Sequence, residues 1–90
     1  MHNKKWIVPI VIAAMIAGIL LPLVYTGYSA ITRGEAEFAA KDYLTAAKTF
    51  EQAARLLIWR SELWEKAGIA AGAGGNLPDA IRFLKRAPEL

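Results

Sequence analysis

Cysteine is absent from this 90-residue sequence, and histidine occurs once, as His2. Without cysteine the chain has no disulfide, thiolate metal site, cysteine nucleophile or cysteine-linked lipid anchor. Paired carboxylates, a nucleophile beside a base, or a metal-ligand cluster cannot be assembled from the remaining residues. We therefore expect no enzymatic activity, no metal, no cofactor and no small-molecule substrate.

The net charge is also small over most of the chain. The formal net charge is +3, but Lys4 and Lys5 stand at the N-terminus, and from Arg33 onward nine Lys and Arg residues face eight Asp and Glu residues. Nucleic-acid binding needs a basic patch or stripe, which a nearly neutral region does not offer. We expect no nucleic-acid partner.

Charged side chains are missing altogether from Trp6 to Thr32, a run of 27 residues. At about 1.5 Å per residue, a helix from Trp6 to Tyr25 reaches roughly 30 Å, which is the hydrocarbon thickness of a bilayer. Trp6 lies at one edge, and Tyr25 and Tyr28 lie at the other. Aromatic rings prefer these headgroup zones. The run predicts a transmembrane helix within residues 1–28, in contact with the lipid bilayer.

Two alternatives to this anchor remain open. A buried helix of a soluble domain would need cover on all sides, more than the rest of so short a chain provides. A cleaved signal peptide would leave a secreted soluble repeat protein, but its apolar region usually spans only roughly 7 to 15 residues. For an uncleaved anchor, Lys4 and Lys5 favour a cytoplasmic N-terminus, with the remainder of the chain on the opposite side.

Small residues and one proline mark the predicted span. Ala14, Ala17 and Gly18 share a face that could admit a second transmembrane helix, and ordinary lipid exposure is the alternative. Pro22 is expected to bend the helix, because proline removes a backbone donor and crowds the preceding turn.

The rest of the chain repeats itself at a shift of 34 residues. This shift aligns Gly34 with Gly68, Ala46 with Ala80, Phe50 with Leu84 and Ala53 with Ala87. A fixed period in this range is typical of helical arrays. Helices are predicted at about 29–40, 43–58, 61–73 and 77–87.

Apolar residues at helical spacing predict the buried faces. The expected core residues are Tyr43, Ala47, Phe50, Ala54, Leu57, Leu63, Trp64, Ala67, Ala71, Leu77, Ile81 and Leu84. Asp42, Ser61 and Asn76 are expected to start helices.

In residue types and spacing, the repeat resembles the tetratricopeptide repeat (TPR) family. The second copy carries the fuller pattern, with Trp64, Gly68, Ala80, Leu84 and Ala87. The first copy keeps Gly34, Tyr43, Ala46, Phe50 and Ala53, but has Ala30 in place of the tryptophan. The resemblance implies that residues 29–90 form two antiparallel helix pairs, at about 27–60 and 61–90, stacked as a right-handed α-solenoid fragment for protein contact.

Two repeats make an incomplete stack, since such arrays usually need three or more units. Either the natural chain continues past Leu90 or a partner covers the open end.

In the TPR family, the first helix of each pair commonly lines the concave binding surface. On this basis the candidate partner-binding residues are Glu35, Phe38, Glu62, Glu65 and Ile69. Simple solvation of an exposed helix face is the alternative for the glutamates. Trp59 is a further candidate, as an interface anchor, with core packing or contact with the bilayer surface as alternatives.

The sequence therefore predicts an all-α, single-pass membrane protein that tethers or braces a partner protein at the membrane surface. The alternative is a small accessory subunit of a large membrane complex, such as a respiratory, photosynthetic or transport assembly. In that case, Ala14 and Gly18 would pack against neighbouring subunits.

Overall fold

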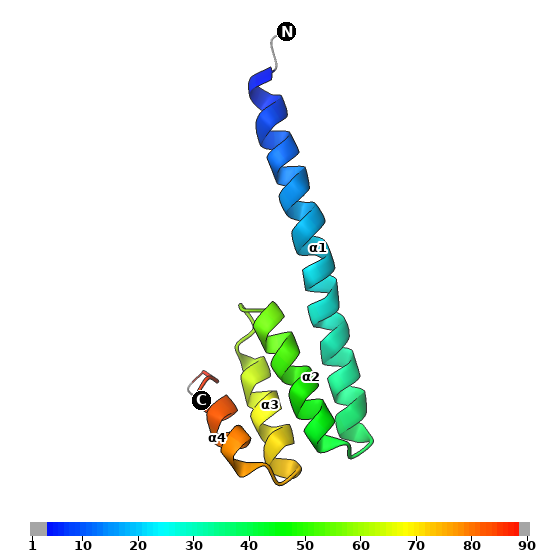
Figure 1. Cartoon of the computed structure of the whole chain (residues 1–90), viewed down its shortest axis with the longest axis vertical. Coiled ribbons are helices and arrows are strands. Elements are labelled where there is room, and N and C mark those ends of the chain that lie inside the picture. The colour runs from blue at the N-terminus through cyan, green and yellow to red at the C-terminus, as the bar shows by residue number, and fades with distance from the viewer. Residues whose placement is uncertain (1–3, 89–90) are drawn as a thin grey trace.

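The computed structural model describes residues 4–88, and this part of the chain is all-α, with no strand. It contains four helices, which are α1 (Lys4–Ala39), α2 (Tyr43–Leu56), α3 (Glu62–Ala73) and α4 (Leu77–Leu84). Each helix packs mainly against its neighbours along the chain. Figure 1 shows α1 as a long rod whose C-terminal part forms one wall of a bundle with the other three helices.

The predicted transmembrane helix and the predicted helix at 29–40 are a single element, so the expectation of two helices in this region is wrong. α1 runs through both Pro9 and Pro22 without interruption. The hydroxyl of Thr26 donates a hydrogen bond of 2.8 Å to the carbonyl of Pro22, within the turn that follows the proline. No proline lies between Pro22 and the end of α1 at Ala39. The predicted boundary between residues 28 and 29 therefore falls inside a continuous helix.

α1 meets two different surroundings along its length. Every side chain from residue 5 to residue 23 is exposed, although almost all of them are apolar. From Gly27 onward, one face of the same helix is buried against α2, at Gly27, Ala30, Ile31 and Gly34. The first half of α1 therefore lacks cover, and the second half belongs to the bundle.

The core of the bundle is built mainly from alanine, which lets helix axes approach closely. The largest fully buried side chains are Leu57, Leu63 and Phe83. The predicted buried faces of α2 and α3 are confirmed, except that Tyr43 is only half-buried.

The predicted buried face of α4 is wrong. Leu77, Ile81 and Leu84 are 63%, 56% and 46% exposed, whereas Ala80 and Phe83 are buried. The Phe83 ring packs 5.9 Å from the Trp64 ring of α3. Since α4 carries apolar residues on two faces and packs mainly against α3, this aromatic contact decides which face turns inward.

The 34-residue repeat reappears in the two turns that join α1 to α2 and α3 to α4. Lys41 and Gly75 are equivalent positions, and both have positive φ, at 66° and 85°. In the first turn, the Asp42 amide donates a 2.9 Å hydrogen bond to the carbonyl of Glu37. In the second, the Asn76 amide donates one of 2.8 Å to the carbonyl of Ala71. Both hairpins therefore close through the same hydrogen-bonded turn.

The helix contacts repeat as well. Each hairpin brings a glycine of its first helix against the residue sixteen positions later in its second helix, pairing Gly34 with Phe50 and Gly68 with Leu84. Asp42, Ser61 and Asn76 precede the helices as expected, and the Asn76 side chain accepts a hydrogen bond from the Asp79 amide.

Exchanges at the two equivalent turn positions should change stability in opposite directions. A left-handed backbone strains a residue with a Cβ, so Lys41→Gly should raise the free energy of unfolding by about 0.5–1 kcal/mol, and Gly75→Ala should lower it similarly. No atom lies within 4 Å of a Cβ placed at Gly75, so backbone strain alone acts there. Urea unfolding in mild detergent, monitored by circular dichroism, measures both changes. A shift in the same direction for both variants would contradict the equivalence of the turns.

Gly27→Ala should separate α1 from α2 at the end of the bundle nearest the exposed half of α1. A Cβ at Gly27 would lie 2.6 Å from Cγ of Leu57, which is 0% exposed and has no room to move. Overpacking of this kind costs about 1–3 kcal/mol, more than the roughly 1 kcal/mol gained in helix propensity. Gly18→Ala is the control, because a Cβ placed there would meet no atom within 4 Å beyond the adjacent residues and backbone of its own helix. Thermal unfolding should show a lower midpoint for Gly27→Ala alone.

Candidate partner-binding groove

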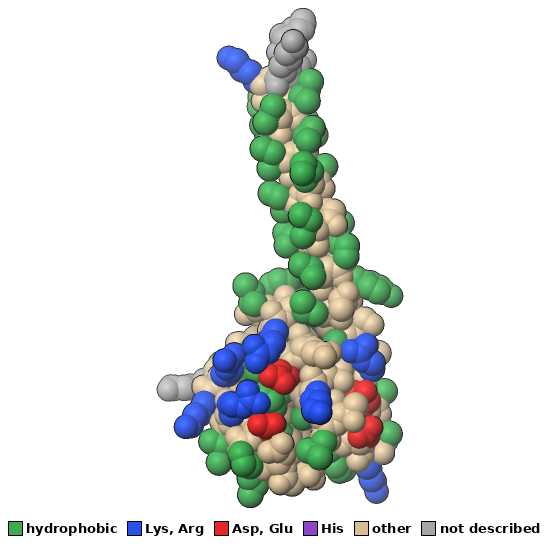
Figure 2. Space-filling view, viewed as in Figure 1, with side chains coloured by type: hydrophobic (Ala, Val, Ile, Leu, Met, Phe, Trp, Pro, Cys, Tyr) green, Lys and Arg blue, Asp and Glu red, His purple; other side chains and the backbone are tan. Residues whose placement is uncertain are grey.

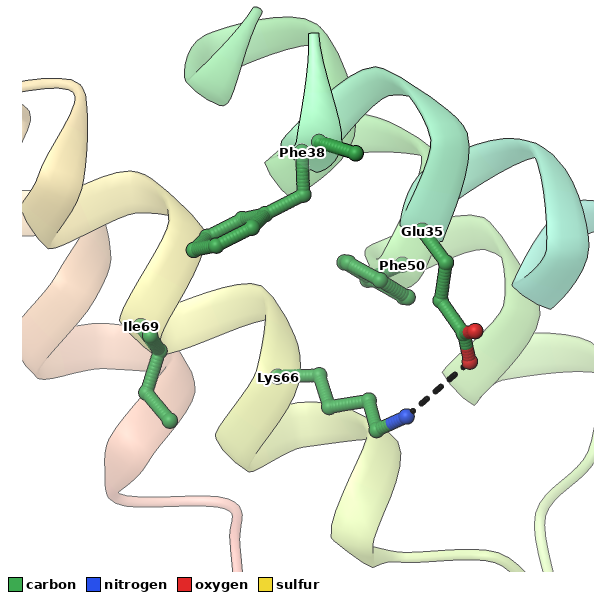
Figure 3. Close-up of a pocket in the computed structure, with 6 residues that line it drawn as sticks. Glu35, Phe38, Phe50, Lys66 and Ile69 are labelled. Carbon is green, nitrogen blue, oxygen red and sulfur yellow. Dashed lines mark hydrogen bonds and ion pairs between the residues drawn. The ribbon is translucent and has the colours of Figure 1, made fainter. Parts of the chain in front are cut away.

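A groove of about 260 Å³ lies between α1 and α3, with α2 at its floor. Phe50 of α2 is almost fully buried there, while Ile69 of α3 remains 51% exposed. Phe38 of α1 projects between the two walls (Figure 3) and packs edge-on against Tyr43, with 5.0 Å between ring centroids. The lining residues are Glu35, Phe38, Ala39, Phe50, Lys66 and Ile69. The groove is therefore apolar inside and framed by two charged side chains.

Those two charged side chains form an ion pair across the groove. Nζ of Lys66 lies 3.2 Å from Oε1 of Glu35, as the dashed line in Figure 3 shows. The ammonium also lies 5.8 Å from the centroid of the Phe50 ring. The two side chains are 41% and 57% exposed, so water screens the pair and its contribution to stability is small. It can open at little cost when another molecule approaches.

The groove is small and partly open. At about 260 Å³ it lies near the lower end of the range of about 300–1,000 Å³ that small-molecule sites usually span. It has room for one or two apolar side chains. The ion pair at its edge could exchange partners with a charged group beside them.

Three of the predicted partner-binding residues meet in this groove, namely Glu35, Phe38 and Ile69. Lys66 and Phe50 were not among the predicted partner-binding residues. Lys66 follows Glu62 by four residues and precedes Ile69 by three, so helical spacing places it on the same face of α3 as these two predicted residues. Phe50 was assigned to the core, and it serves both as core and as groove floor.

The other predicted partner-binding residues lie outside the groove. Glu62 stands at the first turn of α3 and binds the guanidinium of Arg60, with 2.7 Å between Nε and Oε1. Glu65 is half-buried in the same turn. Trp59 is 59% exposed in the turn between α2 and α3, so core packing is not its role.

The small residues of the predicted span are not covered by any other part of residues 4–88. Ala14 and Ala17 are exposed on α1, and nothing lies within 4 Å of a Cβ at Gly18. Their face is open to lipid or to another helix.

Within residues 4–88, no group of three His, Asp or Glu side chains is placed to hold a metal ion. No family model, curated protein or solved structure matches the chain.

Replacing Arg60 should change the titration of Glu62. The hydrogen bond from Arg60, followed by one from the Glu62 backbone amide, lowers the pKa of this carboxyl below its ordinary value. The stabilisation is present above the unfolded-state pKa and is lost as pH falls through the lower folded-state value. Arg60→Gln should therefore raise the pKa of Glu62, as followed by NMR of its carboxyl carbon.

Lys66→Gln is the matched control for that titration. Lys66 acts on Glu62 only through weaker Coulomb attraction, so its removal should raise the same pKa by a smaller amount. Equal shifts in the two variants would contradict the dominant role of the Arg60 hydrogen bond.

Proposed function

We propose that this protein is a single-pass membrane-anchored interaction module, in which α1 crosses the bilayer and a TPR-like helix bundle binds a partner protein beside it. The observation that carries the proposal is the division of α1. Its first half is long and apolar enough to cross a membrane, and none of that segment is buried within the protein. Its second half is a structural wall of the bundle. One helix thus joins the anchor directly to the binding surface.

The repeated hairpins support the TPR-like character of the bundle. Both close through the same turn, and both place a glycine of the first helix against the second helix. The groove then lies between α1 and α3, the first helices of the two hairpins. An apolar segment of a partner protein, carrying a charged group that can replace one member of the Lys66–Glu35 pair, fits this surface.

Tethering supplies the mechanism. A partner confined to the same membrane meets the groove at a high effective concentration, so a weak contact is enough to hold the two together. The basic residues Lys4 and Lys5 favour an N-terminus in the cytoplasm and a bundle on the opposite side.

An accessory subunit of a large membrane complex is the second candidate function. The exposed face formed by Ala14, Ala17 and Gly18 favours it, because small residues let a neighbouring transmembrane helix approach closely. In that case α1 is the principal contact, and the bundle braces a subunit outside the membrane.

Site-directed photocrosslinking in native membranes tests the groove. A photoreactive residue at Ile69 should yield a defined crosslinked protein, because this position faces the groove and is 51% exposed. The same residue at Leu77, which is 63% exposed on α4, is the matched control and should yield much less of that product. Phe38→Asp should abolish the Ile69 product by placing a charge in the apolar interior. Mass spectrometry identifies the products.

Other crosslinking results would contradict the interaction module. Equal products from Ile69 and Leu77 would show that the groove is not the binding surface. Strong products from a photoreactive residue at Ala17, without any from Ile69, would favour the accessory subunit. Release of the chain from membranes by alkaline carbonate would contradict the membrane span itself.

A further inference from the structure

The turn between α2 and α3 carries two adjacent large apolar side chains that the bundle does not cover. Ile58 is 79% exposed and Trp59 is 59% exposed, although Leu57 on one side and Leu63 on the other are fully buried. A single exposed apolar residue is ordinary, but a contiguous apolar tip usually marks a contact surface.

Ile58 and Trp59 form an apolar tip on this turn. Three contacts fix the position of the tip along α1. Leu57 packs against α1 at Gly27. The guanidinium of Arg60 lies 5.6 Å from the centroid of the Tyr28 ring. Val24, one turn earlier, is partly buried against the core. The tip is therefore level with residues 24–28 of α1, and Figure 1 shows this turn at the end of the bundle nearest the exposed half of α1.

That level coincides with the edge of the proposed span. A helix from Trp6 to Tyr25 covers roughly 30 Å, so the headgroup zone begins near Tyr25. Tyr25 and Tyr28 are 76% and 43% exposed there. Trp59 adds a third ring at the same height, and Trp and Tyr are the residues that concentrate in membrane interfaces.

The distribution of charge agrees with this placement. In Figure 2, hydrophobic side chains flank α1 where it enters the bundle, and the Lys and Arg side chains of the bundle begin farther from the span. Arg60, the cation next to the tip, is already bound to Glu62 and lies over Tyr28. Arg60 would therefore enter the interface with its charge already paired.

We infer that Ile58 and Trp59 insert into the interfacial layer of the leaflet from which α1 emerges, giving the protein a second membrane contact. This inference rests on the proposed membrane span. Two contacts, one through α1 and one through the tip, fix the tilt of the bundle where a single span would leave it free to lean. Phe38 then lies about 15 Å along α1 from Tyr28, which leaves the groove open to the aqueous segment of a partner.

Spin labels on single cysteines test the second contact, because the native chain contains no cysteine. The full chain is reconstituted into phosphatidylcholine vesicles with the label at Ile58→Cys, Leu77→Cys or Leu21→Cys. These positions are 79%, 63% and 66% exposed within the protein, so the bundle itself shields none of them. Oxygen concentrates in lipid and a nickel chelate in water, and their ratio of collision rates reports the depth of each label.

The expected ratio of oxygen to nickel collisions at Ile58→Cys is several-fold higher than at Leu77→Cys and lower than at Leu21→Cys. Adding Trp59→Ser to the Ile58→Cys chain should reduce the ratio toward the Leu77→Cys value, because the interfacial ring is lost.

Three outcomes would overturn the inference. Equal ratios at positions 58 and 77, with a high ratio at position 21, would leave the span intact and place the tip in water. A low ratio at position 21 would refute the span together with the tip contact. A label at position 58 that is shielded from both reagents would show that protein, such as a second copy of the chain, covers the tip.

Discussion

The structure depends on the continuity of α1. A helix satisfies its backbone hydrogen bonds internally, so it can pass from one solvent to another without a break in its backbone. Here that property joins an exposed apolar segment to the wall of a bundle. Any turn placed between the two would have left backbone groups to be satisfied elsewhere and would have uncoupled the bundle from the span.

The α1–α2 contact attaches the rest of the bundle to this continuous helix. Gly27 and Gly34 allow Leu57 and Phe50 to pack closely against α1, and these two side chains belong to the core. The same contact places the α2–α3 turn at the end of the bundle nearest the exposed half of α1, and the groove toward the opposite end. The proposed partner surface and the proposed lipid-contacting tip are therefore held apart by the packing of one helix pair.

Much of the fold could be predicted from the sequence. The 34-residue shift predicts two similar hairpins, and the turns at Lys41 and Gly75 share a conformation. Glu35, Phe38 and Ile69 were also predicted as partner-binding residues, because the resemblance to the TPR family implies that the first helix of each pair lines the binding surface. The register of α4 was not predictable, because its apolar residues occupy two faces and only the contact between Phe83 and Trp64 selects one. Lys66 escaped notice because its pairing with Glu35 joins residues that are distant in sequence.

The sequence by itself determined the all-α class, the uncharged run of membrane-spanning length and the repeating hairpins, because these follow from local periodicity and composition. Only the three-dimensional structure decided that the apolar run and the first bundle helix are one element, that the groove has an ion pair at its edge, and that Arg60, next to Trp59, lies against Tyr28. The ion pair and the Arg60–Tyr28 contact depend on distances between residues far apart in the chain. Such distances arise from packing, which a local pattern does not encode.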